Sequence, residues 1–174
     1  IMDIEKGAAW IPFPLMERFM RDVFVGLGAP KADAAICANV LIKADEFGFD
    51  SHGISRLKPI YYDRIKQGIQ LAQTRVRVVK DSAGTAVLAG GNGMGHVVAH
   101  KAINLAIRKA RKHGLGMVAV RNSTHFGIAG YYPLMAVKAG MIGICGTNAR
   151  PSIAPTFGVE NMLGTNPLTF AMPT

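Results

Sequence analysis

Residues 85–122 read TAVLAGGNGMGHVVAHKAINLAIRKARKHGLGMVAVRN, and this stretch decides the fold class. The apolar run TAVLAG at 85–90 predicts a strand, because it is short and ends in glycines. Residues 95–114 predict a long helix that ends in basic residues and a glycine, and GMVAVRN at 116–122 predicts a second strand. A strand, a helix and a strand in this order indicate an α/β unit with at least some parallel pairing.

The predicted alternation continues on both sides of this stretch. YYPLMAVKAG at 131–140 predicts a helix, MIGICGTN at 141–148 a strand, and NPLTFAMP at 166–173 the first half of a further strand. Upstream, TRVRVVK at 74–80 alternates apolar and basic residues, as a half-buried strand does. The turn signal DSAG then predicts a hairpin between TRVRVVK and TAVLAG.

The first third of the chain reads as helices. Apolar residues recur at helical spacing in residues 14–27 and again in residues 30–47. A third helix is predicted over 59–67, because a proline opens this segment and a glycine follows it. We therefore expect a helical domain over residues 1–72 and an α/β domain over residues 73–174.

Composition narrows the class of protein. A hydrophobic content of 49% and a charged content of 18% are typical of an ordered globular protein. The longest apolar runs are too short to cross a bilayer and the N-terminus lacks the pattern of a signal peptide, so we expect a cytoplasmic protein. Cys37 and Cys145 lie far apart in apolar surroundings, which favours buried free thiols over a disulfide or a thiolate metal cluster.

The net charge of +9 is compatible with a nucleic acid, an anionic membrane or small anionic ligands as partners. The densest basic cluster, RKARKHG at 108–114, ends a helical segment. The helix dipole favours cations at this end, and a glycine commonly caps the helix there. No aromatic residues are interleaved with it to stack on bases. We therefore expect a solvated helix end here, and keep a basic nucleic-acid binder as an alternative that rests on charge alone.

The segment DSHGISR, residues 50–56, concentrates polar chemistry directly after a helical segment. His52 can exchange a proton with a substrate oxygen, because the reference pKa of histidine is about 6.5. Ser51 can orient the imidazole through a hydrogen bond, and Arg56 can hold a carboxylate. A structural alternative stays open, in which Asp50 or Ser51 caps a helix and His52 is merely solvated.

A second polar cluster, RNSTHFGIAGYY at 121–132, falls between a predicted strand and a predicted helix. Ligands bind at such positions in α/β sheets, and the N-terminus of a helix favours anions. Asn122, Ser123 and Thr124 offer donors and acceptors beside His125. The alternative is that a hydroxyl side chain caps the helix while His125 satisfies a buried group.

Three further features carry weaker signals. GGNGMGH at 90–96 has the spacing of neither phosphate-binding glycine motif, so it predicts a plain turn, although backbone contact with a cofactor stays open. His96 and His100 are four residues apart, but no third metal ligand is indicated, and we expect no metal site. GTN occurs at 146–148 and at 164–166, beside predicted strands, and is typical of turns.

Taken together and in order, five segments resemble the malate/L-lactate dehydrogenase family, which includes sulfolactate, ureidoglycolate and diketogulonate dehydrogenases. These segments are DSHGISRLKPIY, GNGMGHVVAHKAI, VRNSTHFGIAGYY, TNARPSIAPTFG and LGTNPLTFAMP. The resemblance spans nearly the whole chain, and the motifs are specific in combination.

The resemblance implies an α/β fold, with an N-terminal helical domain packed on a mixed-sheet α/β/α cofactor domain of non-Rossmann type. It implies hydride transfer between NAD or NADP and a 2-oxo acid, or a cyclic imino acid in one branch, by dimers or higher homo-oligomers. Members are roughly twice as long as this chain, so it resembles an N-terminal half. An alternative is a noncatalytic fragment whose role is to assemble with a complementary C-terminal chain.

The resemblance also implies roles for individual residues. The histidine of the SHG motif, His52, is the proton donor or acceptor, and Ser51 assists it. Arg56 holds the substrate carboxylate. In some members the histidine of the HFG motif, here His125, is assigned the proton transfer instead. Thr165, in the LGTNP motif, faces substrate or cofactor.

For the cofactor, the resemblance points to His125, Phe126 and Gly127 of the HFG motif and to Asn166 of the LGTNP motif. No metal is implied. The expected partners are a small anionic substrate and further copies of the chain or a C-terminal half, with neither nucleic acid nor membrane.

Overall fold

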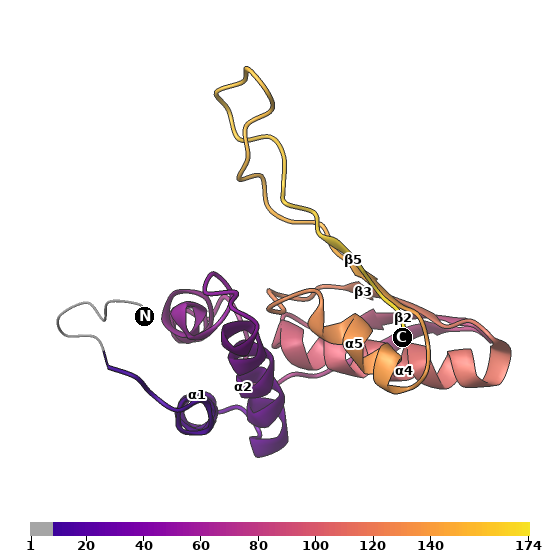
Figure 1. Ribbon diagram of the computed structural model, residues 1–174, viewed down its shortest axis with the longest axis horizontal. Coiled ribbons are helices and arrows are strands. Elements are labelled where there is room, and N and C mark those ends of the chain that lie inside the picture. Colours follow the sequence, from indigo (N-terminus) through magenta and orange to yellow (C-terminus); the bar gives the residue numbers. More distant parts are fainter. Residues whose placement is uncertain (1–8) are drawn as a thin grey trace.

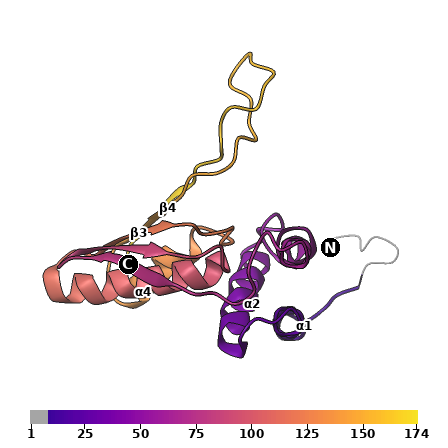
Figure 2. The same cartoon turned by 180° about the vertical axis from the view of Figure 1, so that it is seen from behind.

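The computed structural model describes residues 9–174 and shows a helical lobe beside an α/β lobe (Figure 1). The helical lobe begins with α1 (Phe13–Gly26) and α2 (Lys31–Glu46), which pack closely against each other. Both match the predicted helices within a residue. The opposite view shows the same two lobes, with one arm of chain projecting away from the α/β lobe (Figure 2).

The third helical segment differs from the prediction in where it starts and in its geometry. A 3-10 turn (Ile54–Arg56), a π-helical segment (Leu57–Tyr62) and the short α3 (Asp63–Lys66) follow one another. Helical structure thus begins five residues before Pro59, and the prediction that Pro59 opens the helix was wrong. A proline inside a helix cannot donate the usual backbone hydrogen bond, and wider or tighter turns accommodate this loss.

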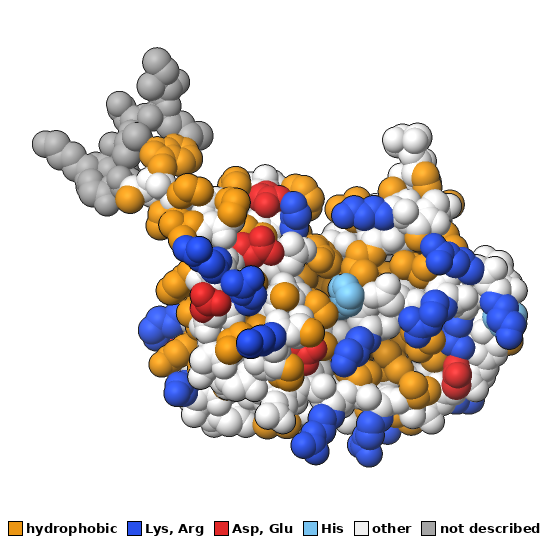
Figure 3. Space-filling model, turned by 90° about the horizontal axis from the view of Figure 1, so that it is seen from below, with side chains coloured by type: hydrophobic (Ala, Val, Ile, Leu, Met, Phe, Trp, Pro, Cys, Tyr) orange, Lys and Arg blue, Asp and Glu red, His pale blue; other side chains and the backbone are white. Residues whose placement is uncertain are grey.

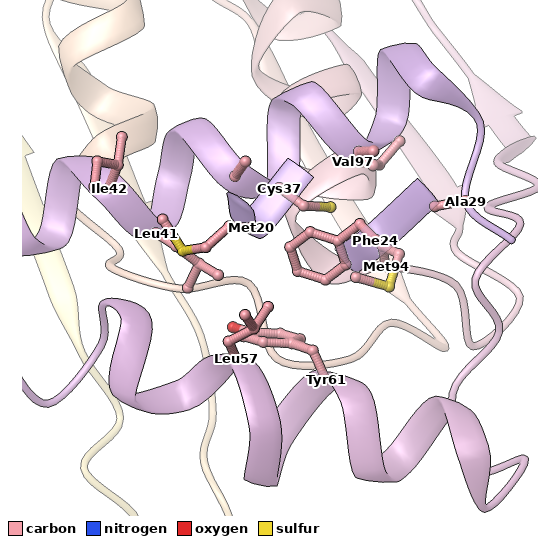
Figure 4. Packing of buried hydrophobic residues seen from close by; sticks show 12 residues of the cluster. Met20, Phe24, Ala29, Cys37, Leu41, Ile42, Leu57, Tyr61, Met94 and Val97 are labelled. Atoms are coloured by element: carbon pink, nitrogen blue, oxygen red, sulfur yellow. The ribbon is translucent and has the colours of Figure 1, made fainter. Parts of the chain in front are cut away.

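One buried cluster joins the two lobes (Figure 4). Phe24 from α1 and Leu41 from α2 meet Tyr61 from the π-helical segment, and all three are at most 1% exposed. Met94 and Val97, at the start of α4 (Gly95–His113), complete the cluster from the α/β side. Burial of each large apolar side chain contributes about 1.5–3 kcal/mol, so the cluster fixes one lobe against the other.

The main sheet has three strands in the order β1 (Arg77–Asp81), β2 (Thr85–Ala89) and β3 (Met117–Arg121). β1 pairs with β2 in an antiparallel hairpin, and β2 pairs with β3 in parallel across α4. The sheet is therefore mixed, as the resemblance implied. The predicted strand, helix and strand between residues 85 and 122 are confirmed.

The prediction that β1 is half-buried was wrong, since all five of its residues are exposed. Val78 is 58% exposed and Val79 47% exposed. The reason lies in the position of β1 at the edge of the sheet, while α4 packs mainly against β2 and β3. Alternation along a strand indicates that one face is suited to burial, but a neighbouring element must supply the cover.

The remaining elements are α5 (Tyr131–Lys138), β4 (Gly143–Gly146) and β5 (Leu168–Ala171). β4 does not join the main sheet, because it pairs with β5 as a separate antiparallel pair. Residues 147–167 between them form the projecting arm of Figure 1, closed on itself by the bridge between Ile153 and Leu163.

The helix α4 ends as the sequence predicted. Its last turn carries Arg111, Lys112 and His113, and Gly114 follows with φ of +81°. Cys37 and Cys145 are free thiols; Cys37 is buried and Cys145 half-buried. Among residues 9–174, no helix has the length and the apolar character needed to span a membrane.

Candidate active site

The turn that carries His52 is built on Asp45, at the end of α2. The Asp45 carboxylate accepts the backbone N–H of Ile54 at 2.9 Å, and thus caps the helical segment that follows. A Cβ on Gly53 would overlap this carboxylate, so the turn can close on Asp45 only with glycine at 53. The structural alternative, in which Asp50 or Ser51 caps the helix, is therefore wrong.

Ser51, His52 and Arg56 are linked within this turn. The Ser51 hydroxyl lies 2.8 Å from Nδ1 of His52, and Nε of Arg56 donates to the Ser51 carbonyl. His52 precedes the helical segment, so it does not share a helix face with Arg56. Partial burial, followed by the positive charge of Arg56, lowers the pKa of His52 below 6.5.

His125 comes from the loop between β3 and α5, which is tied to the start of α4. The Thr124 hydroxyl accepts the N–H of Gly95 at 3.1 Å and donates to the Gly93 carbonyl at 2.8 Å. Thr124 therefore caps α4 and not α5, the helix that directly follows it in the sequence. A Cβ on Gly95 would overlap the Thr124 and His125 carbonyls, so this close approach requires glycine.

The two lobes bring His52 and His125 together. Their ring centroids lie 5.6 Å apart with the planes 23° from parallel. The Tyr61 hydroxyl bonds Nδ1 of His125 at 2.6 Å, which confirms that His125 satisfies a buried polar group. Two imidazoles, a hydroxyl and a guanidinium thus lie together where the lobes meet.

His125 is neutral at physiological pH. Burial is the main reason that its pKa falls to about 4, and the positive charges of His52, Arg64 and Arg56 add to the effect. This surrounding positive potential favours a bound anion. The space-filling view shows Lys and Arg side chains spread over both lobes, with few Asp and Glu side chains between them (Figure 3).

His96 lies beneath this site and is more buried than the sequence suggested. It is 0% exposed, its ring centroid is 4.7 Å from that of Tyr61, and neither ring nitrogen has a hydrogen-bond partner among the described residues. Burial, followed by the charge of His125, lowers the pKa of His96 to about 3. His100 is partly buried beside Asn104, so His96 and His100 occupy different surroundings.

Acid should destabilise the protein through His96. An unfolded histidine has a pKa of about 6.5, so the unfolded state binds more protons than the folded state between pH 6.5 and about 3. The free energy of unfolding should therefore fall as the pH falls below 6.5, by up to about 1.4 kcal/mol per pH unit for this residue. In urea unfolding at pH 7 to 5, His96→Gln should reduce this slope, whereas His113→Gln, at the exposed end of α4, should not. An unchanged slope in His96→Gln would contradict the assignment.

The other predicted site residues have mainly structural contacts. The Phe126 ring stacks on Tyr132 with centroids 5.2 Å apart. Gly127 is buried, with φ of +78°. Thr165 and Asn166 lie at the base of the arm, where Asn166 accepts the N–H of Ala149 at 2.8 Å. The structure therefore brings together Ser51, His52, Arg56 and His125, but not the two arm residues.

Sequence reasoning missed Tyr61 and Asp45. The contact between Tyr61 and His125 joins residues 64 positions apart, and no local pattern signals it. For Asp45 a weak signal existed, because an acidic residue near the end of a helix is followed within ten positions by a glycine at 53. The sequence does not show whether the chain between them turns back far enough for the carboxylate to reach the backbone.

These features define an α/β protein in which two histidines and an arginine lie together between a helical lobe and a mixed-sheet lobe. A family model described as malate/L-lactate dehydrogenase matches residues 11–174, so the chain belongs to the malate/L-lactate dehydrogenase family. The family predicted from the five motifs, and its fold class, are thereby confirmed.

Individual relatives support this family assignment. The malate dehydrogenase of Pyrococcus abyssi is 49% identical over 171 residues, covering 98% of this chain and 47% of that protein. The L-sulfolactate dehydrogenase of Methanocaldococcus jannaschii is 46% identical over 89% of this chain and 45% of its own length. The solved malate dehydrogenase of Pyrococcus horikoshii matches with a TM-score of 0.94 and 43% identity, over all of this chain and 50% of that one. The chain spans about half the length of the curated relatives it matches.

Proposed function

We propose that this chain forms the acid–base half of an NAD(P)-dependent oxidoreductase that interconverts a 2-oxo acid and a 2-hydroxy acid. The observation that carries the proposal is the pairing of His52 and His125, 5.6 Å apart, beside Arg56 and Arg64. Malate and sulfolactate, which appear in the names of the relatives, are both 2-hydroxy acids. A cyclic imino acid remains an alternative substrate.

His52 is the proposed proton donor in reduction. Negative charge grows on the substrate oxygen as the carbonyl carbon is reduced, and a nearby imidazolium lowers this barrier. Nδ1 of His52 is engaged by the Ser51 hydroxyl, so Nε2 is the nitrogen that exchanges the proton. A hydroxyl can accept from the imidazolium and donate to the neutral ring, so Ser51 supports both protonation states.

Arg56 is the proposed partner of the substrate carboxylate. Its Nε is held by the Ser51 carbonyl, which fixes the guanidinium close to His52. A guanidinium binds a carboxylate through two parallel hydrogen bonds, and this orients the acid as well as attracting it. The carboxylate and the reacting oxygen would then be held by the same short turn.

The residues of the loop between β3 and α5 fit a nicotinamide cofactor, which supplies the hydride when bound. The loop lies at the carboxyl end of a parallel strand, where α/β folds bind their ligands. A Cβ at Gly130 would meet open space, so the backbone there is accessible to a ligand. We propose His125, Phe126 and Gly127 on this loop, and Thr165 and Asn166 of the arm, as residues that face the cofactor or substrate.

The test is oxidation of NADH and of NADPH by the intact protein, with pyruvate, oxaloacetate, sulfopyruvate and a cyclic imino acid as substrates. The same assay on residues 1–174 alone asks whether this half is sufficient. Turnover of a 2-oxo acid supports the proposal and names the substrate. Folded intact protein that oxidises neither cofactor with any of the four would contradict it.

We also propose that the protein assembles through the arm, either with further copies of itself or with a C-terminal half. Three apolar arm residues, Phe157, Val159 and Met162, are 104%, 96% and 66% exposed. Several large apolar side chains exposed on one segment are typical of a contact with another surface. Light scattering should give the intact protein the mass of an oligomer, and Phe157→Ser with Val159→Ser should shift that mass toward a monomer. A monomeric mass for the intact protein would exclude the homo-oligomer.

The division into a helical domain of residues 1–72 and an α/β domain of residues 73–174 is part of the same proposal. It is supported by the change from helices to strands between Lys66 and Arg77. Because the buried cluster includes Met94 and Val97, the two parts share a core and are expected to unfold together.

A further inference from the structure

The inference begins with the position of the Tyr61 hydroxyl. Tyr61 is 0% exposed, and its ring is held edge-on by Phe24 at 5.9 Å and against His96 at 4.7 Å. Packing on both sides leaves the ring little freedom to move. Its hydroxyl meets Nδ1 of His125 at 2.6 Å, so a rigid side chain of the helical lobe contacts the imidazole of the α/β lobe.

A second group reaches the same nitrogen. The backbone N–H of Gly127 points at Nδ1 of His125, with the two nitrogens 3.4 Å apart. The peptide is held there by close packing, since a Cβ on Gly127 would lie 2.6 Å from Cγ1 of Val40 and 3.3 Å from Nε2 of His96. A backbone N–H can only donate, so this contact requires a lone pair on Nδ1.

The lone pair determines where the ring proton resides. If Nδ1 accepts from Gly127, the Tyr61 hydroxyl also donates to Nδ1, and the proton of a neutral imidazole must lie on Nε2. We propose that Tyr61 is a positioning residue that, together with the Gly127 amide, holds His125 as the neutral tautomer with its proton on Nε2. His125 is then a hydrogen-bond donor and not a base.

This tautomer gives the two histidines different roles in the reaction. This consequence rests on the proposed function. Nε2–H of His125 donates a hydrogen bond to the substrate oxygen, while His52 exchanges a proton with it. Two imidazolium rings 5.6 Å apart would repel each other, so only one of the pair carries a charge at a time. Arg56 opposes a charge on both rings, and the deeper burial of His125 leaves that role to the more exposed His52.

The tautomer is tested by long-range proton–nitrogen NMR of the intact protein labelled with ¹⁵N-histidine at pH 7. His125→Gln assigns the His125 signals. We expect wild-type His125 to show an unprotonated Nδ1 and a protonated Nε2. We expect Tyr61→Phe to add the opposite tautomer, and the matched control Tyr62→Phe, at a partly exposed neighbouring position, to leave the spectrum unchanged.

Three results would overturn the proposal. A neutral His125 with its proton on Nδ1 in the wild type would show that the assigned tautomer is wrong. A doubly protonated ring would show that His125 is not neutral. The same tautomer in Tyr61→Phe as in the wild type would show that Tyr61 does not hold it. The wild-type spectrum decides the tautomer even if Tyr61→Phe fails to fold.

Kinetics separate this proposal from the proposed function. In the intact enzyme, Tyr61→Phe should lower kcat about tenfold while the KM of the keto acid changes little, because the affected hydrogen bond matters most in the transition state. An unchanged kcat would show that the two histidines do not divide the work in this way. If the spectrum shows Nε2–H but no keto acid is reduced, the proposed function fails and the tautomer assignment stands.

Discussion

We expect His52→Ala to lower kcat for reduction of the keto acid by about 10²–10⁴-fold, which is the usual contribution of a positioned general acid. The affinity for the cofactor should change little, because the substitution removes one imidazole from a partly exposed turn. Steady-state kinetics with titration of NADH or NADPH binding would measure both quantities. His113→Ala, at the exposed end of α4, is the matched control for loss of a histidine.

The pH dependence sharpens this prediction. The pKa of His52 is lowered below 6.5, and the protonated form is the one that donates in reduction. The kcat/KM for reduction should therefore fall as the pH rises through that pKa, and the profile should flatten in His52→Ala. Turnover near the wild-type value in His52→Ala would make the assignment of His52 wrong, and His125 would become the candidate acid.

The second large effect is expected for Gly95→Ala. The new methyl group would overlap the carbonyls of Thr124 and His125 and would lie 2.7 Å from the carbonyl carbon of His125. Backbone cannot move away as a flexible side chain can, so the loop must shift and lose the hydrogen bond between Thr124 and the start of α4. We expect a cost of about 2–4 kcal/mol in the free energy of unfolding, measured in urea.

Gly26→Ala provides the control for Gly95→Ala. Gly26 is the last residue of α1, and a Cβ there would meet nothing within 4 Å. Alanine is preferred over glycine in a helix, so the change should be neutral or stabilising by up to about 1 kcal/mol. If Gly95→Ala is as stable as Gly26→Ala, the close approach of the β3–α5 loop to α4 does not exist in solution.

Much of the fold was predictable because it depends on local pattern. The helical spacing of apolar residues identified α1 and α2, and the order of elements around α4 predicted at least some parallel pairing, which the structure shows between β2 and β3. The errors arose where another part of the chain decides the outcome. The exposure of β1 depends on whether a helix covers it, and the helical start at Ile54 depends on the carboxylate of Asp45.

The candidate site divides in the same way. Ser51, His52 and Arg56 were predictable as a group, because one short turn holds all three. His125 was identified by its place between a strand and a helix, but its pairing with a buried hydroxyl was left as one of two alternatives. Tyr61 had no signal at all, since its role is defined by a partner 64 residues away.

The sequence by itself determined the order of the elements, the two histidine motifs and the family, because each of these is a property of neighbouring residues. The tertiary structure alone decided that His52 faces His125, that Thr124 caps a helix that precedes it in the chain, and that Tyr61 lies between two imidazoles. The physical reason is that these contacts depend on packing between two lobes. Their apolar cluster sets distances and burial, and burial in turn lowers the pKa values of His96 and His125.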